Sequence, residues 1–274
     1  MPHATGEIKT RLRATPTLWC PGCSNGIVTR AIIDALLGLQ LDPEKVAVIA
    51  GIGCAGRITS YLEYSTVHTA HGRALAVATG AKAAAPDLQV LVVMGDGDCV
   101  AIGGNHLIHA ARRNIDLTAI VFNNSIYGMT GGQMSPTTHL GDKSTTSVYG
   151  NVEAAFDLCE LAHAAGATYV ARGTPYSYVN LAQLIAGGIA HKGFAFVEAM
   201  VSCPTYYGRQ NGIPKASDMM KRQHARAVPV AKFEGEGARL HDCYPTGVLH
   251  HAERDEYTAA YAGVVRKATE RGDG

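Results

Sequence analysis

The chain has 274 residues, of which 47% are hydrophobic and only 17% are charged, and its formal net charge at pH 7 is +1. This composition excludes a disordered chain and a coiled coil, and the absence of like-charged blocks argues against a nucleic-acid partner. No apolar run approaches the ~18 residues of a membrane span and no signal-peptide pattern opens the chain, so we expect a cytoplasmic protein with a small-molecule ligand and no membrane contact.

Short apolar runs alternate with helix-like stretches, which predicts β-α-β units around a mostly parallel sheet. In chain order we expect a helix at 27–39, a strand at 46–50, a helix at 73–85, a strand at 88–94, a helix at 101–113, a strand at 117–122, a helix at 153–165, a strand at 167–171, a helix at 176–190 and a strand at 194–200. Because the strand runs are continuously apolar, helices should cover both faces of this α/β sheet.

The periodicity fades beyond residue 203, where further helices are indicated at 217–227 and 253–269. No low-complexity linker divides the chain. We therefore predict one domain over residues 1–204 and a C-terminal extension over residues 205–274, which packs on this domain or on a partner.

Polar residues follow two of the predicted strands. The sequence GDGD, Gly95–Asp98, follows the strand at 88–94, and Asn124 lies 28 residues after Asp96, at the end of the next strand. One β-α-β unit has this length, so both side chains should emerge at neighbouring carboxyl ends of the sheet. A carboxylate and an amide oxygen suit Mg²⁺ with a phosphate ligand, and Gly97 keeps the approach to it clear. The alternative is that these are turn residues without a ligand.

The seven cysteines do not suggest a disulfide framework, because their number is odd and a reducing compartment would keep them as thiols. Four of them lie beside Gly or Pro in predicted loops: Cys20, Cys23, Cys54 and Cys203. Four such sulfurs suit a [4Fe–4S] cluster, and zinc bound by four thiolates is the alternative. The other three lie on or beside helical stretches and are expected to be buried hydrophobes: Cys99, Cys159 and Cys243.

Two motifs suggest other functions. WCPGC, Trp19–Cys23, before a helix is similar to a thioredoxin-type redox site, but that interpretation gives Cys54, Cys203 and the GDGD segment no role. GIGCAG, Gly51–Gly56, matches the dinucleotide-binding pattern after a strand, but the acidic residue expected about 20 positions later is missing.

The segment from Gly95 to Thr138 reads GDGDCVAIGGNHLIHAARRNIDLTAIVFNNSIYGMTGGQMSPTT. GDG followed by NN resembles the diphosphate-binding motif of thiamine diphosphate enzymes. The longer string closely resembles the β subunits of 2-oxoacid:ferredoxin oxidoreductases, and the resemblance extends from Trp19 to about Thr205. It implies the thiamine diphosphate-binding fold of the diphosphate type.

The resemblance also implies specific ligands. Mg²⁺ would be held by Asp96, Asn124 and the backbone carbonyl of Ile126, and the four loop cysteines would hold the cluster. The residues expected beside thiamine diphosphate are Gly53, Cys54, Gly95, Asp96, Gly97, Asp98, Asn124, Ile126, Gly128, Met129 and Thr130. His71 is expected near the thiamine and the substrate, with a turn or helix-capping role as the alternative; His106 and His109 are expected to be structural.

The activity implied is the coenzyme A-dependent oxidative decarboxylation of a 2-oxoacid, with electrons passing through the cluster to ferredoxin, or the reverse carboxylation. We expect 2-oxoglutarate as the substrate, because Arg57 follows Cys54 closely and could bind a distal carboxylate. The alternatives are a structural Arg57, and a broad-range or branched-chain enzyme with Met129 in an apolar pocket. A non-catalytic zinc-binding module is a more distant alternative.

A second polypeptide is part of this expectation. The resembling enzymes take the glutamate that activates thiamine from a pyrimidine-binding domain, and the chain has room for only one such sheet. We therefore expect an α subunit that carries this domain, in an αβ or (αβ)₂ assembly.

Overall fold

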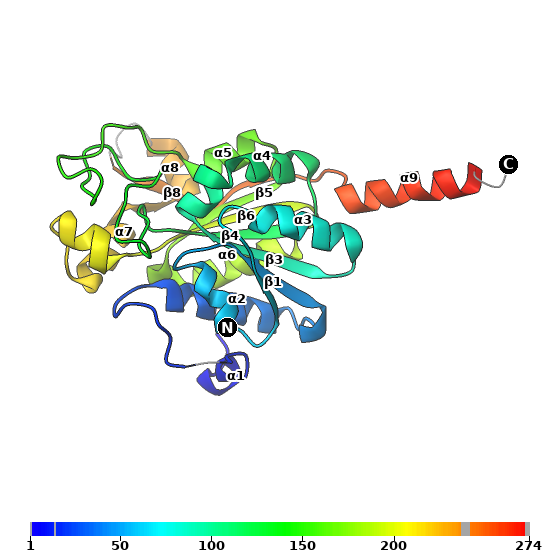
Figure 1. Cartoon of the computed structure of the whole chain (residues 1–274), viewed down its shortest axis with the longest axis horizontal. Helices are drawn as coiled ribbons and strands as arrows, with labels where there is room; N and C mark the ends of the chain where they lie inside the picture. Colours follow the sequence, from blue (N-terminus) through cyan, green and yellow to red (C-terminus); the bar gives the residue numbers. More distant parts are fainter. Residues whose placement is uncertain (1, 14, 237–241, 272–274) are drawn as a thin grey trace.

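The computed structural model describes residues 2–13, 15–236 and 242–271, and within them the strands form one eight-stranded sheet (Figure 1). The spatial order is β2 (Ser65–His68), β1 (Val46–Ala50), β3 (Gln89–Gly95), β4 (Leu117–Asn123), β6 (Phe194–Met200), β5 (Tyr169–Gly173), β8 (Tyr244–His251) and β7 (Ala227–Pro229). Neighbouring strands pair in parallel except β5 and β8, which pair antiparallel. The predicted α/β sheet is confirmed.

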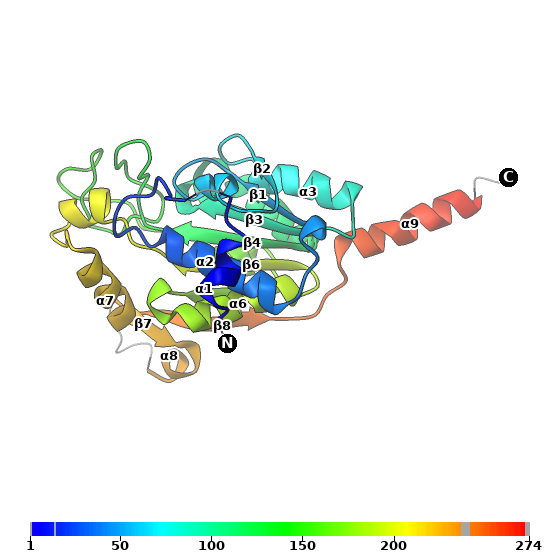
Figure 2. The ribbon, with the colours of Figure 1, turned by 90° about the horizontal axis from the view of Figure 1, so that it is seen from below.

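Helices pack on both faces of the sheet, as the apolar strand runs predicted. Figure 1 shows α2 (Asn25–Gly38) and α6 (Tyr178–Ala190) on one face and α3 (Ala74–Ala84), α4 (Gly104–Arg113) and α5 (Leu158–Ala164) on the other, and Figure 2 shows α2 and α6 from their own side. Each face has its own core of buried residues. Every residue of β4 is buried, so the strand that ends beside Asn124 lies at the centre of the molecule.

Three predicted helices begin at least three residues later than expected, and one of them, the helix indicated at 253–269, starts at Tyr257. The helix at 101–113 is preceded by a π-helical turn, Asp98–Ile102, and the α-helix itself starts at Gly104. The helix expected at 153–165 starts only at Leu158, because the carboxylate of Asp157 accepts hydrogen bonds from the N–H groups of Cys159 and Glu160 and caps it there.

The C-terminal extension contributes two strands to the sheet. It contains α7 (Ala216–Arg226), β7, α8 (Val230–Glu236), β8 and α9 (Tyr257–Arg271), and the short α1 (Thr5–Lys9) lies near the other end of the chain. α9 extends away from the body of the molecule in both views (Figures 1 and 2). The division at residue 204 stays a prediction, and residues 237–241 and 272–274 of the extension lie outside the described residues. No described helix is long and apolar enough to cross a membrane.

Candidate functional site

A cavity of about 160 Å³ opens where β1, β3 and β4 end. All residues that the sequence predicted beside the cofactor line it: Gly53, Cys54, Gly95, Asp96, Gly97, Asp98, Asn124, Ile126, Gly128, Met129 and Thr130. His71 lines it as well. The cavity therefore lies at the carboxyl ends of parallel strands, where open α/β sheets bind ligands.

Asp96 provides a buried carboxylate in this cavity. Its residue is 2% exposed, and its Oδ2 accepts hydrogen bonds from the hydroxyls of Ser135 and Thr137, each at 2.6 Å. Burial raises the pKa of Asp96, while these two hydrogen bonds act in the opposite direction. A divalent cation beside this group would hold it as a carboxylate, so the site fits the predicted role in binding Mg²⁺.

The turn after β4 positions the other two predicted oxygen ligands, the side-chain oxygen of Asn124 and the backbone carbonyl of Ile126. Ser125 has a φ of 57°, in the left-handed region, and Oδ1 of Asn124 accepts a hydrogen bond of 3.2 Å from the N–H of Ile126. Gly97 on the facing turn must lack a side chain, because a Cβ there would lie 2.3 Å from the Tyr127 ring. The tight contact between these turns brings the GDG and NN motifs together.

Asp98 contacts His71 within the same cavity. The Oδ1 atom of Asp98 lies 2.5 Å from Nδ1 of His71 and accepts a 2.7 Å hydrogen bond from the N–H of Gly72. A Cβ on Gly51 would lie 1.7 Å from Oδ2 of Asp98, so the carboxylate fills the space beside that glycine. Burial raises the pKa of Asp98, although the Gly72 N–H and His71 act to lower it. Asp98 thus ties His71 to the ends of β1 and β3.

A second cavity, of about 200 Å³, adjoins the first and is lined by four thiols: Cys20, Cys23, Cys54 and Cys203. The two cavities share Cys54, Asn124, Gly128 and Met129. A Cβ on Gly128 would lie 3.6 Å from the sulfurs of both Cys54 and Cys203. The four cysteines that the sequence grouped together therefore surround one space.

Burial opposes the ionisation of two of the thiols, Cys23 and Cys54. It raises the pKa of Cys23 to about 12, and it raises the pKa of Cys54, with the neighbouring thiols adding to the effect. Arg57 lines this cavity and partly offsets the shift at Cys54. Thiolates at such a site require a strong positive charge, which iron or zinc would supply.

The spacing of the four sulfurs differs from that of a site for a single zinc ion. Four sulfurs around one tetrahedral zinc, at about 2.3 Å each, would lie about 3.8 Å from one another. Among the described residues, no three of these cysteines bring their sulfurs within 4.8 Å of one another. The arrangement is wider than a one-metal site.

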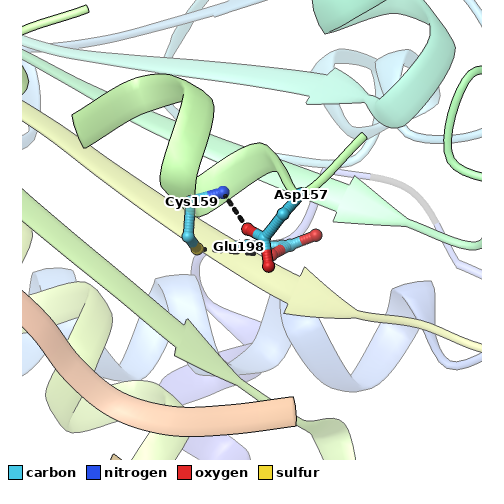
Figure 3. Close-up of side chains that lie close together, drawn as sticks. All are labelled: Asp157, Cys159 and Glu198. Carbon is cyan, nitrogen blue, oxygen red and sulfur yellow. Dashed lines mark hydrogen bonds between the residues drawn. The ribbon is translucent and has the colours of Figure 1, made fainter. Parts of the chain in front are cut away.

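A third group of potential ligands lies elsewhere in the sheet. Asp157, Cys159 and Glu198 have ligand atoms within 4.8 Å of one another (Figure 3). The guanidinium of Arg172 lies 2.6 Å from both Asp157 and Glu198, so a cation already neutralises these carboxylates. We interpret this group as a buried ion-pair network and not as a metal site.

Within the described residues, the remaining cysteines and histidines line neither cavity. Cys99 and Cys159 are buried, as expected, whereas Cys243 is partly exposed. His106 and His109 lie on α4.

Three contributors to the site escaped the sequence interpretation. Asn25 is 1% exposed and lines the first cavity, and its Oδ1 has no hydrogen-bond partner among the described residues. Its position two residues after Cys23 is the one available signal. Ser135 and Thr137 belong to the hydroxyl-rich SPTT run, but nothing local in that run indicates a contact with Asp96.

Comparisons with known proteins agree with this geometry. Residues 41–199 match the family model of the thiamine pyrophosphate enzyme C-terminal TPP-binding domain. The chain is 54% identical over 206 residues to the 2-oxoglutarate synthase subunit KorB of Methanocaldococcus jannaschii, covering 75% of this chain and 76% of that one. It is 58% identical over 197 residues to the subunit of the same name from Archaeoglobus fulgidus, covering 72% and 73%.

A solved structure extends the similarity over almost the whole chain. The 2-oxoglutarate:ferredoxin oxidoreductase from Magnetococcus marinus, with 2-oxoglutarate, coenzyme A and succinyl-CoA bound, superposes with a TM-score of 0.88 at 32% identity. The match covers 96% of this chain and 91% of that chain.

Proposed function

This chain belongs to the β subunits of the 2-oxoacid:ferredoxin oxidoreductases, as the motifs between Trp19 and Thr205 predicted, and from that membership we propose its substrate and cofactors. It is part of a thiamine diphosphate-dependent oxidoreductase. We propose that the substrate is 2-oxoglutarate, that the product is succinyl-CoA, and that the chain also holds Mg²⁺ and a [4Fe–4S] cluster. Reductive carboxylation is the same chemistry in reverse.

The single observation that carries this proposal is the pair of adjoining cavities. Oxygens suited to Mg²⁺ and diphosphate line one, four thiols line the other, and Cys54 and Gly128 line both. When bound, thiamine diphosphate supplies the carbanion chemistry by which a 2-oxoacid loses carbon dioxide, and an adjacent cluster accepts electrons singly. The chain's own contribution is to hold these two groups next to each other.

Each group has its proposed ligands in this chain. Asp96, Asn124 and the carbonyl of Ile126 would hold Mg²⁺. The four thiols would hold the cluster. His71, oriented by Asp98, would face the reacting part of the substrate from the rim of the first cavity.

As a β subunit, the chain acts together with an α subunit. We propose that this partner supplies the pyrimidine-binding domain with its activating glutamate, in an αβ or (αβ)₂ assembly, and that ferredoxin receives the electrons. The similar subunits named for 2-oxoglutarate and the charge of Arg57 support 2-oxoglutarate as the substrate. We propose a cytoplasmic location.

The test is ferredoxin reduction by the anaerobically purified αβ complex. We expect coenzyme A-dependent reduction with 2-oxoglutarate, weaker activity with pyruvate and 2-oxoisovalerate, and none from the isolated chain. Equal rates with all three 2-oxoacids would contradict the substrate, and turnover by the isolated chain would contradict the need for a partner.

A further inference from the structure

We propose that Ser135 and Thr137 are positioning residues that select Mg²⁺ at Asp96, by occupying one oxygen of its carboxylate and leaving the other for the cation. The proposal deepens the function above and rests on it. Both hydroxyls come from the loop between β4 and α5, 39 and 41 residues after Asp96 in the chain.

The contacts are short and buried. Each hydroxyl oxygen lies 2.6 Å from Oδ2 of Asp96, which is the range of an O–H donor bonded to a charged carboxylate. Asp96, Ser135 and Thr137 are each 2% exposed, so water does not compete for these positions. Both donors act on the same oxygen, and Oδ1 accepts no side-chain hydrogen bond from the described residues.

Thr137 is itself held by a buried network. Its Oγ1 lies 3.1 Å from Oδ1 of Asn123, and Nδ2 of Asn123 donates a 2.7 Å hydrogen bond to Oε1 of Glu198. Arg172 neutralises Glu198 through its other oxygen, at 2.6 Å. Because Thr137 has a single hydroxyl proton, which it donates to Asp96, the contact with Oδ1 of Asn123 places the side chain against the end of β4 and is not a second full hydrogen bond.

The consequence is a carboxylate that can offer a cation only one oxygen. Mg²⁺ requires a nearly ideal octahedron and accepts carboxylates through single oxygens, whereas Ca²⁺ takes more ligands and commonly binds both oxygens of a carboxylate. With Oδ2 occupied by two donors, two-oxygen binding of a larger cation is blocked. The two hydroxyls thus favour Mg²⁺ over Ca²⁺ and fix the direction of the metal bond.

The test is calorimetry on the anaerobic αβ complex from which divalent cations and thiamine diphosphate have been removed. It measures how tightly thiamine diphosphate binds in the presence of Mg²⁺ and in the presence of Ca²⁺. The variants are Ser135→Ala, Thr137→Val and the two combined. Thr137→Ser keeps the hydroxyl. Thr118→Val is the matched control, because this buried threonine of β4 donates its hydroxyl to the carbonyl of Gly188, away from the cavity.

We expect Ser135→Ala and Thr137→Val each to weaken Mg²⁺ by roughly 10-fold or more, the usual loss when a group that orients a metal ligand is removed. Binding supported by Ca²⁺ should weaken less than binding supported by Mg²⁺, or become tighter. The ratio of the Mg²⁺ affinity to the Ca²⁺ affinity should therefore fall. Thr137→Ser and Thr118→Val should keep the wild-type ratio. Iron and sulfide contents equal to wild type would show that the variants fold.

An unchanged ratio in the combined variant, with folding intact, would overturn the inference and leave the proposed function standing. Equal losses for both cations would also overturn it, because they would show a structural role alone. If the wild-type complex bound no thiamine diphosphate with either cation, the proposed function itself would fail.

Discussion

His71 and Asp98 form a pair across the rim of the cofactor cavity, with Nδ1 of the imidazole 2.5 Å from Oδ1 of the carboxylate. The contact fixes the ring and leaves Nε2 as the nitrogen available to a ligand. Asp98 is the second aspartate of GDGD, and its contacts differ from those of Asp96 two residues earlier: its carboxylate binds the imidazole of His71 and the N–H of Gly72.

Asp98→Asn should separate these two roles. We expect the kcat of the αβ complex to fall by ~10-fold or more, since His71 loses its charged partner, while the affinity for thiamine diphosphate stays near wild type. Steady-state kinetics and calorimetry measure the two quantities. A large loss of cofactor affinity with unchanged kcat would show that Asp98 acts on cofactor binding instead.

Asp96→Ala should give the opposite pattern. Because its carboxylate is the proposed direct ligand of Mg²⁺, the variant should lose thiamine diphosphate during purification while it keeps iron and sulfide. Cofactor content per chain is the measurement. Wild-type retention of thiamine diphosphate would refute this assignment.

The lining of the cysteine cavity predicts which thiols are needed for iron binding. Cys203→Ala should abolish the iron content of the complex, because its sulfur lines the cysteine cavity and lies close to the same point beside Gly128 as the sulfur of Cys54. Cys243→Ala, a partly exposed cysteine outside both cavities, should keep it. Iron and sulfide analysis of both variants decides this, and equal iron contents would contradict the cluster assignment.

Arg57 tests substrate choice. It lines the cysteine cavity and not the first one, so a distal carboxylate would have to approach it through the wall that the cavities share. Arg57→Ala should lower kcat/KM for 2-oxoglutarate, with a loss of transition-state stabilisation of roughly 2 to 4 kcal/mol. The loss should be much smaller for pyruvate and 2-oxoisovalerate. A uniform loss over the three substrates would assign Arg57 to the cysteine site alone.

Glu256 makes the attachment of α9 depend on pH. Burial opposes its ionisation, but hydrogen bonds from the hydroxyl and N–H of Thr258 and the N–H groups of Ala259 and Asp116 outweigh burial and lower its pKa below 4.5. A carboxyl group whose pKa is lower in the folded than in the unfolded chain stabilises the fold at pH values above the unfolded-state pKa. This stabilisation is lost as the pH falls through the folded-state pKa.

Glu256→Gln should therefore speed hydrogen exchange at the start of α9 at pH 7. Variant and wild type should converge as the pH falls from 4.5 through the lowered pKa of Glu256 in the folded protein. Mass spectrometry of peptides spanning this junction measures the difference. A difference that does not shrink as the pH falls below 4.5 would contradict the role of the carboxylate charge.

Local pattern was sufficient for the central strands and for Asp96 and Asn124 at their ends, whereas most of the other residues expected beside the cofactor came from the family resemblance. Strands such as 194–200 were predicted with their observed bounds, because their apolar runs are continuous and end at turn residues. β2, by contrast, was missed, since it is a four-residue edge strand that is largely exposed and has no apolar signature. β8 was missed because its residues are only partly buried at the antiparallel edge.

The contacts that complete the site depend on tertiary structure. The hydroxyls of Ser135 and Thr137 reach Asp96 only because the loop after β4 folds back over the end of β3. The His71–Asp98 pair likewise joins the turn after β2 to the turn after β3. Periodicity reports which residues face a core, but it carries no information on which loops meet across the edge of a sheet.

We propose that one chain holds a thiamine diphosphate site and an iron–sulfur cluster side by side. Electron paramagnetic resonance of the anaerobically purified αβ complex, before and after 2-oxoglutarate and coenzyme A are added, tests this arrangement. We expect a brown protein whose cluster signal appears or grows on addition of substrate, and does not do so in the Asp96→Ala variant. A colourless complex that contains zinc and gives no substrate-dependent signal would contradict it.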